Sequence, residues 1–298
     1  MRIFIESKKQ ELNAIIIAHY YQLPEIQEIA DFVGDSLQMA RQAARTEARV
    51  IICCGVRFMA ESAKILSPEK TVILPDIQAG CPMADMITAE QLRAMKADHP
   101  NAAVVCYVNS SAEVKAESDI CCTSSNAVNV VRSIPEEQPV IFVPDRNLGS
   151  YVESQTGRKM IRWEGCCPIH DVLTLQDIET QKKLHPDAIL VVHPECPPAV
   201  CRQADAVCST GGMLQYIKSS TAKEFIIGTE EGFLHTLQQN CPDKQFYLAR
   251  AGFQCRDMKY ISLEKLTRAM DSMAYQIEVA EEIRKRARIV LDRMIAIN

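Results

Sequence analysis

The chain has 298 residues, of which 47% are hydrophobic and 24% charged, and its formal net charge is −5. This length allows one large domain or two to three small ones, and the composition excludes a disordered chain. No long apolar run, secretory signal or cluster of basic and aromatic residues occurs, so we expect a cytoplasmic protein that binds neither a membrane nor nucleic acid.

Thirteen cysteines are many for an intracellular chain. Several stand in adjacent pairs, which suit a framework of disulfides poorly, so we expect free thiols in a reducing compartment. Because free cysteine packs like a small hydrophobic side chain, most of them should lie in buried strands. This expectation covers Cys53, Cys54, Cys106 and Cys208.

The first part of the chain alternates between apolar runs typical of buried parallel strands and stretches with helical periodicity. The expected elements are a strand at 14–19, helices at 24–33 and from Ser36, a strand at 50–54, a helix at 58–66 and a strand at 71–74. Ser36 is placed to cap the second helix. The alternation predicts an α/β fold with a parallel sheet covered by helices on both faces.

Three series of residues recur along the chain with spacings between 85 and 88 residues. They are the polar residues His19, Tyr107 and His193, the hydroxyls Ser36, Ser124 and Ser209, and the cysteines Cys81, Cys167 and Cys255. Apolar runs that match the first strands precede each polar residue. A fixed period of this kind predicts a threefold repeat of one structural unit.

The repeats divide the chain into α/β units at 1–87, 88–174 and 175–261, followed by a helical segment at 262–298. Each unit should form three layers, with a parallel sheet between helices. The last segment has apolar residues at helical spacing, among them Leu266, Met270 and Ile277. We expect it to cover an otherwise exposed face of the units.

Polar side chains follow the first strand of each unit. They are His19 and Tyr21, Tyr107 and Asn109, and His193 and Glu195. Open parallel sheets bind ligands outside the carboxyl ends of their strands, and three equivalent ends could face a common centre. These side chains should therefore meet at one site. The alternative for any one of them is a satisfied core residue without a catalytic role.

The hydroxyl series lies where helices should begin, at Ser36, Ser124, Ser209 and Thr210. A helix N-terminus offers free amides and the positive end of a dipole to an anion. A single serine there is commonly just an N-cap. Its recurrence in three units favours a small ligand with several negative charges.

The cysteine series would bring three thiolates together without a local C-x-x-C motif. Zinc is one hypothesis, since it accepts cysteine and histidine ligands and His170 lies three residues after Cys167. An iron–sulfur cluster is the sharper one, because three thiolates on four irons leave one iron free to act as a Lewis acid. Such an iron suits dehydration and not electron transfer.

Seven motifs occur in order along the chain. They are His19-Tyr20-Tyr21-Gln22, Gly34-Asp35-Ser36-Leu37-Gln38, Cys81-Pro82-Met83-Ala84, Tyr107-Val108-Asn109-Ser110, Pro144-Asp145-Arg146-Asn147-Leu148-Gly149, His193-Pro194-Glu195-Cys196-Pro197 and Ser209-Thr210-Gly211. Together they resemble the quinolinate synthase family, and the resemblance covers nearly the whole chain. It implies three similar α/β units around a pseudo-threefold axis, with a 4Fe-4S cluster at the centre.

The resemblance implies that Cys81, Cys167 and Cys255 bind this cluster, with Cys166 packed behind it. It further implies the condensation of iminoaspartate with dihydroxyacetone phosphate to quinolinate, with loss of phosphate and water, as an early step of NAD biosynthesis. Functional coupling to the enzyme that makes iminoaspartate would follow. We interpret Asp145 and Arg146 as an ion pair that locks a loop.

Roles for the strand-end residues follow from the implied reaction. The candidates for proton transfer are Tyr21, Tyr107, Glu195 and His193. The candidates for substrate binding are His19, Ser36, Tyr107, Asn109, Ser124, His193, Glu195, Ser209 and Thr210. Two alternatives stay open, namely another iron–sulfur hydro-lyase and a non-catalytic iron–sulfur sensor or electron carrier. The dense polar strand ends beside three cysteines favour an enzyme, since a carrier has no need of them.

Overall fold

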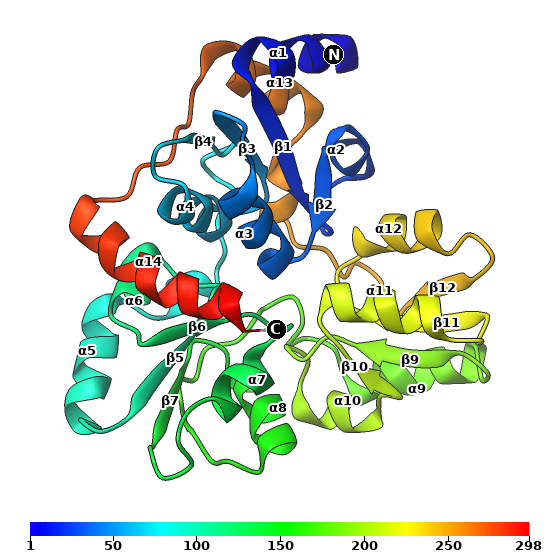
Figure 1. Ribbon diagram of the computed structural model, residues 1–298. Coiled ribbons are helices and arrows are strands. Elements are labelled where there is room, and N and C mark those ends of the chain that lie inside the picture. The colour runs from blue at the N-terminus through cyan, green and yellow to red at the C-terminus, as the bar shows by residue number, and fades with distance from the viewer. Residues whose placement is uncertain (298) are drawn as a thin grey trace.

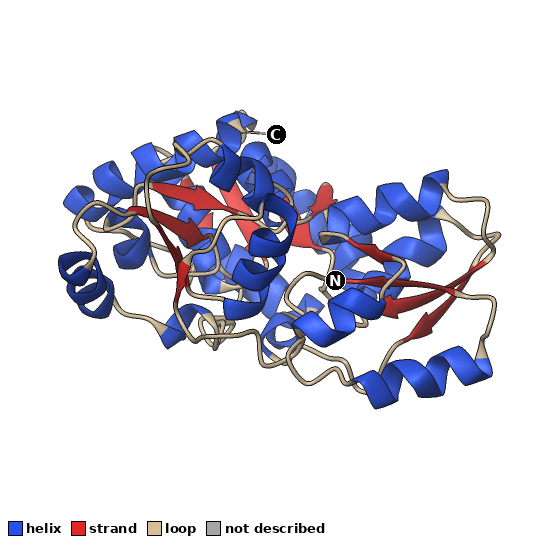
Figure 2. Ribbon diagram, turned by 90° about the horizontal axis from the view of Figure 1, so that it is seen from below, coloured by secondary structure: helices blue, strands red, loops and turns tan. Residues whose placement is uncertain are grey.

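Three separate parallel sheets form the framework of the protein. The computed structural model describes residues 1–297, and residue 298 of the predicted C-terminal segment lies outside them. Each sheet has four strands, and the three sheets with their helices surround a common centre (Figure 1). The strands lie between layers of helices (Figure 2). The predicted α/β class with three similar units is confirmed.

All three sheets have the same strand order: the second strand of the unit lies at one edge, followed across the sheet by the first, the third and the fourth. The first sheet contains β1 (Ala14–His19), β2 (Phe32–Gly34), β3 (Val50–Cys54) and β4 (Thr71–Ile73). The second contains β5 (Ala103–Tyr107), β6 (Ile120–Cys122), β7 (Val140–Val143) and β8 (Ile161–Arg162), and the third β9 (Ile189–Val192), β10 (Ala206–Val207), β11 (Glu224–Gly228) and β12 (Gln245–Leu248). The unit boundaries at 87, 174 and 261 stay predictions.

Helices cover both faces of these sheets, as expected for strands that are buried on both sides. They are α1 (Arg2–Leu12), α2 (Pro24–Ile29), α3 (Ser36–Arg45), α4 (Arg57–Leu66), α5 (Ala89–Asp98), α6 (Ala112–Ala116), α7 (Ala127–Arg132), α8 (Arg146–Thr156), α9 (Leu175–Leu184), α10 (Pro198–Gln203), α11 (Thr210–Ser219), α12 (Phe233–Asn240), α13 (Leu263–Ser272) and α14 (Glu281–Ala296). None of the helices in residues 1–297 is long and apolar enough to cross a membrane.

The predicted helix at 24–33 is wrong in its second half. Helix α2 ends at Ile29, and Val33 belongs to the edge strand β2. Asp31 causes the change, because its backbone N–H binds the Ile16 carbonyl at 2.9 Å and its carboxylate accepts the Ile16 amide at 2.8 Å. These two bonds draw the chain to the edge of the sheet.

An aspartate makes the same pair of hydrogen bonds in all three units, which supports the repeat. The carboxylates of Asp119 and Asp205 accept the backbone amides of Val104 and Leu190 at 2.8 and 2.7 Å. Their own backbone N–H groups bind the carbonyls of the same two residues. Each short second strand therefore begins directly after an aspartate that is fixed to the first strand.

The pairing of the strands changes one member of the predicted hydroxyl series, by a single residue. His19 pairs with Gly34 and Tyr107 with Cys122, while Val192 pairs with Val207, which aligns His193 with Cys208. Two residues further along the second strands stand Ser36, Ser124 and Thr210. Thr210, and not Ser209, is thus the third member of the hydroxyl series.

The C-terminal segment contains two helices that pack against different units. Helix α13 lies against α1, and α14 contacts α4 of the first unit and α6 and β6 of the second (Figure 1). Arg41 and Asn126 donate hydrogen bonds to the Ile297 carbonyl beyond α14. This helix therefore ties the first two units together.

The cysteines follow the expected pattern of free, mostly buried thiols. Cys53, Cys54 and Cys106 are completely buried in strands, whereas Cys208 is partly exposed. All thirteen lie within the described residues as free thiols.

Candidate active site

A cavity lies where the strand ends of the three units meet. It contains nearly every residue that the sequence predicts for the site. Those that line it are His19, Tyr21, Ser36, Cys81, Tyr107, Asn109, Ser124, Cys167, His193, Glu195, Thr210 and Cys255. Ser209 does not line it, because its hydroxyl caps α11 by accepting the Gly212 amide at 3.2 Å.

The cysteine side of the cavity, formed by Cys81, Cys167 and Cys255, consists of three equivalent loops. In each unit, the third residue after the third strand donates its backbone N–H to the carbonyl two positions before the cysteine. The donor and acceptor pairs are Arg57 and Ala79 at 2.8 Å, Arg146 and Gly165 at 2.8 Å, and Glu231 and Phe253 at 2.9 Å. One hydrogen bond per unit thus fixes each cysteine at the same place relative to its sheet.

Buried carboxylates hold two of these three loops. Asp145 accepts the backbone amides of Leu148 at 2.7 Å and Cys167 at 3.1 Å. Glu230 accepts the Cys255 amide at 3.0 Å and pairs with Lys259 at 2.9 Å. Both carboxylates are completely buried, and burial raises the pKa of each.

The first unit lacks such a carboxylate, because Val56 occupies the equivalent position two residues after β3. The loop that carries Cys81 is therefore held without a buried anion at that position. The interpretation of Asp145 and Arg146 as an ion pair is wrong. Arg146 pairs with Asp171 at 2.9 Å, which leaves Asp145 to bind the two amides.

A hydrogen-bonded network connects the two tyrosines of the site. Tyr107 Oη donates to Glu195 Oε1 at 2.6 Å, and Glu195 Oε2 lies 2.7 Å from His170 Nδ1. His170 Nε2 contacts Thr229 Oγ1 at 2.9 Å, and that oxygen lies 2.6 Å from Tyr21 Oη. The network takes residues from all three units.

Burial perturbs the titratable groups of this network strongly. It lowers the pKa of His19 and of His193 to about 3, so both imidazoles are neutral near pH 7. It raises the pKa of Tyr21 and Tyr107, and the Glu195 charge adds to both shifts. Burial also acts to raise the pKa of Glu195, but the imidazoles of His193 and His170 outweigh it and lower the pKa to about 2.

Ser36, Ser124 and Thr210 form the hydroxyl side of the cavity. Ser36 and Thr210 are the first residues of α3 and α11, whereas Ser124 lies in the turn before α7, so the expected helix start at Ser124 is wrong. The sequence predicts Ser36 as the cap of α3, and this prediction is wrong. Asp35 caps this helix instead, because its carboxylate accepts the Gln38 amide at 2.9 Å in a capping box. Ser36 is thus free of capping and lines the cavity.

A contact between units closes the hydroxyl side. Ser125 Oγ lies 2.8 Å from Asp35 Oδ2 and 2.9 Å from Ser209 Oγ, so one hydroxyl joins all three units. Beside it, the Ser124 hydroxyl lies 3.2 Å from His193 Nε2.

The sequence matches a family model over almost its whole length. Residues 4–296 fit the model described as Quinolinate synthetase A protein. The chain belongs to this family. Among curated relatives named quinolinate synthase, it is 54% identical to that of Desulforudis audaxviator and 53% identical to that of Methanosarcina barkeri, each over 293 residues. A Geobacter sp. strain M21 relative of the same name is 55% identical, and each match covers 98% of this chain and 96–97% of the relative.

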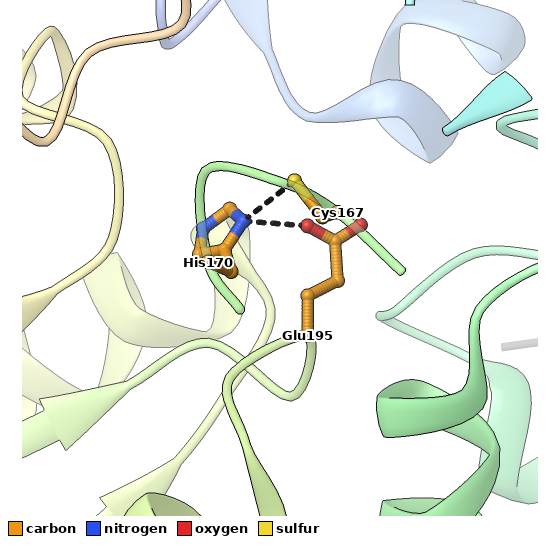
Figure 3. A group of neighbouring side chains, drawn as sticks. All are labelled: Cys167, His170 and Glu195. Carbon is orange, nitrogen blue, oxygen red and sulfur yellow. Dashed lines mark hydrogen bonds and ion pairs between the residues drawn. The ribbon is translucent and has the colours of Figure 1, made fainter. Parts of the chain in front are cut away.

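Three residues of the site also form a group of the kind that the zinc hypothesis requires. Cys167, His170 and Glu195 offer three ligand atoms within 4.8 Å of one another, a set that could hold a single metal ion (Figure 3). This group uses one of the three equivalent cysteines. In the structure, the Glu195 carboxylate already lies at hydrogen-bond distance from His170 Nδ1, so the group is satisfied without a metal.

Four residues of the site escape the sequence analysis in part or entirely. His170 was considered only as a zinc ligand, and Thr229, Glu230 and the role of Asp145 were missed. All but His170 lie within two residues of the end of a third strand, at Thr229 and Glu230 after β11 and at Asp145 after β7. Their position at strand ends is the signal that could have found them.

Proposed function

We propose that this chain is a quinolinate synthase, which condenses iminoaspartate with dihydroxyacetone phosphate to quinolinate and releases phosphate and water. One observation carries the proposal beyond family membership. A single cavity is lined by three equivalent cysteines and by the polar strand ends of three units. An electron carrier would need the three cysteines and not the polar strand ends.

We further propose that Cys81, Cys167 and Cys255 hold a 4Fe-4S cluster. The residues fit this group, because they occupy equivalent loops around one cavity, and no fourth cysteine lines it among the described residues. When bound, such a cluster supplies an iron without a cysteine ligand, which acts as a Lewis acid on oxygen groups of the substrate. Burial raises the pKa of all three thiols, so metal binding must displace their protons.

The hydroxyl side suits the anionic groups of the substrates. Helices α3 and α11 begin there, and their first residues, Ser36 and Thr210, add a hydroxyl to the free backbone amides. The neutral imidazole of His193 adds a polar group without charge. Asn109 Oδ1 is buried without a hydrogen-bond partner among residues 1–297, so it suits an N–H or O–H of a bound substrate.

Glu195 is the proposed general base, with Tyr107 next to it. Its low pKa keeps the carboxylate ionised, and the Tyr107 hydroxyl donates a hydrogen bond to it at 2.6 Å. Tyr21 and His193 line the same cavity and complete the proposed set of proton-transfer residues.

The test is to incubate anaerobic protein with iminoaspartate and dihydroxyacetone phosphate and to measure quinolinate and phosphate. Both products should appear in equal amounts. Release of neither, in protein with full iron and sulfide content, would overturn the proposed function. Turnover of a simple hydroxy acid by dehydration would instead favour a different iron–sulfur hydro-lyase.

We also propose functional coupling to the enzyme that makes iminoaspartate, because an imine hydrolyses readily in water. A cytoplasmic location agrees with the free thiols. Quinolinate should form faster when that enzyme is present than when an equal concentration of imine is added alone. Equal rates would argue against coupling.

A further inference from the structure

Asn147 is buried in the first turn of α8, and the proposed reaction gives it no role. It does not line the cavity, so it does not reach the substrate itself. Its side-chain nitrogen Nδ2 lies 3.0 Å from the Glu195 carbonyl oxygen and 2.7 Å from Asp171 Oδ1. Helix α8 belongs to the second unit, whereas Glu195 follows β9 of the third. The Asn147 side chain therefore joins two units beside the site.

The two partners fix the orientation of the Asn147 amide. A backbone carbonyl and a carboxylate both accept hydrogen bonds, so the NH2 group and not the amide oxygen must face them. Each of the two N–H groups then serves one partner. Asp171 is held from its other side as well, because its Oδ2 lies 2.9 Å from Arg146 Nη2. The second N–H of Asn147 is thus directed at the Glu195 carbonyl.

The Glu195 carboxylate depends on how the third unit sits against the second. Its two closest side-chain partners belong to the second unit, with Tyr107 Oη 2.6 Å from Oε1 and His170 Nδ1 2.7 Å from Oε2. His193 Nδ1, from the same unit as Glu195, lies farther away, at 3.5 Å. A slip between the units would change both short distances. The hydrogen bond from Asn147 opposes such a slip at the Glu195 backbone.

The same asparagine is connected to the loop that carries Cys167. The Asp171 amide donates to the Cys167 carbonyl at 2.9 Å, and the Cys167 amide donates to Asp145 Oδ2 at 3.1 Å. Asp145 caps α8, and Asn147 is the second residue of this helix. The start of α8 therefore holds the Cys167 loop and the Glu195 backbone together.

We propose that Asn147 is a positioning residue, which fixes the Glu195 carboxylate against Tyr107 and His170 by holding the Glu195 backbone. The inference rests on the proposed function, because Glu195 is the general base of that reaction. Asn147 acts through Glu195 and not on the substrate. The position matters because a reacting group displaced by about 1 Å can lose about a hundredfold in rate.

Variants separate the two hydrogen bonds of Asn147. Asn147→Leu keeps the branched shape and removes both N–H groups, so kcat at equal iron content should fall by about tenfold to a hundredfold, while KM changes less than about threefold. Asn147→Ala removes the same groups from a smaller side chain and should act in the same direction, even if leucine does not fit. Asp171→Leu removes only the bond to the cysteine loop, so it should lower the iron content while kcat at equal iron content falls less than in Asn147→Leu.

The matched control is Asn240→Leu, at an asparagine outside the site whose Nδ2 donates to the Thr236 carbonyl at 2.9 Å. It should keep both kcat and iron content. If Asn147 served only the stability of the fold, its variants would unfold more easily but keep the kcat of the wild type at equal iron content. That result, or equal losses of kcat in Asp171→Leu and Asn147→Leu, would overturn the inference.

A second measurement tests the geometry without turnover. In metal-free protein labelled with ¹³C-glutamate, the carboxylate signal of Glu195 is assigned by its absence in Glu195→Gln. It should shift in Asn147→Leu and Asn147→Ala and stay in place in Asn240→Leu. An unchanged signal in both Asn147 variants would also overturn the inference. If the wild type forms no quinolinate, the proposed function fails, whereas the ¹³C signal still tests Asn147.

Discussion

The cysteine side and the hydroxyl side of the cavity are built from the same repeats but are held in different ways. Each cysteine loop is fixed within its own unit, by a backbone hydrogen bond and, in two units, by a buried carboxylate. The hydroxyl side is instead joined across units, through Ser125, Asp35 and Ser209. Cysteine positions therefore depend first on bonds within each loop, with Trp163 Nε1 also donating to the Met86 carbonyl at 2.8 Å between the first two units. The hydroxyl positions depend on how the units dock.

This difference predicts which property a substitution on each side of the cavity should alter. A substitution on the cysteine side should release a bound metal group and leave the fold intact. A change on the hydroxyl side should affect the binding of anions and the stability of the assembled units. A substitution of Glu195 should lower the rate of the reaction without releasing the metal group.

The largest effect is expected from the cysteines themselves. Cys81→Ala, Cys167→Ala and Cys255→Ala should each abolish the cluster and the activity, because three thiolates are the whole protein ligand set of the proposed group. Cys166→Ala is the matched control and should retain the cluster, since Cys166 does not line the cavity. Iron and sulfide assays on anaerobically purified protein check this. Full cluster content in Cys255→Ala would contradict the ligand assignment.

Glu195→Gln comes next and should separate chemistry from metal binding. The variant should keep its iron and sulfide but lose turnover by about a hundredfold or more, because the amide cannot accept a proton as the carboxylate does. The measurement is the rate of quinolinate formation at equal iron content. A rate like that of the wild type would remove Glu195 from the proposed chemistry.

The buried carboxylates should give a smaller and local effect on the cysteine side. Asp145 accepts two amides through its two oxygens, and Asn can accept only one of them, so Asp145→Asn should cost about 1–3 kcal/mol of stability and loosen one loop. In metal-free protein, alkylation of Cys167 should become faster while that of Cys81 stays unchanged, measured by mass spectrometry. Asp243→Asn, at an exposed pair with Lys223, is the control. Equal acceleration at both cysteines would show that the loops are not held independently.

The smallest effect concerns pH and the hydroxyl side. The pKa of His193 is lowered by burial from 6.5 to about 3, so the unfolded chain binds a proton that the folded one does not between these values. The free energy of unfolding should therefore fall as the pH drops below 6.5, by about 1.4 kcal/mol per unit for this group. His193→Asn should reduce that dependence below about pH 6.5 in urea unfolding. An identical pH dependence in the variant would contradict the shift.

Much of the architecture could be predicted because the repeats leave a direct mark on the sequence. Buried parallel strands read as apolar runs, and their polar ends and the cysteines recur at one period, which predicts the three units and the residues that meet between them. Strand β2 was missed because it has only three residues, and an apolar residue such as Val33 fits a helix pattern equally well.

The rest could not be predicted because it depends on contacts between units. Thr229 and Tyr21 are 208 residues apart, and no local pattern links a threonine after one strand to a tyrosine after another. The role of Asp145 was also hidden, since the adjacent Arg146 suggests a local pair, whereas its actual partner is Asp171. The register of the third hydroxyl needed the strand pairing itself.

The distribution of the cysteines over three loops has a consequence for how the protein matures. Cys81 and Cys255 lie 174 residues apart in the chain, so no nascent segment can assemble the ligand set before most of the polypeptide has been made. A group bound by all three can be inserted only after the third unit has folded and docked. Insertion is therefore a late step, and until then three thiols remain open to oxidation and to capture of the wrong metal.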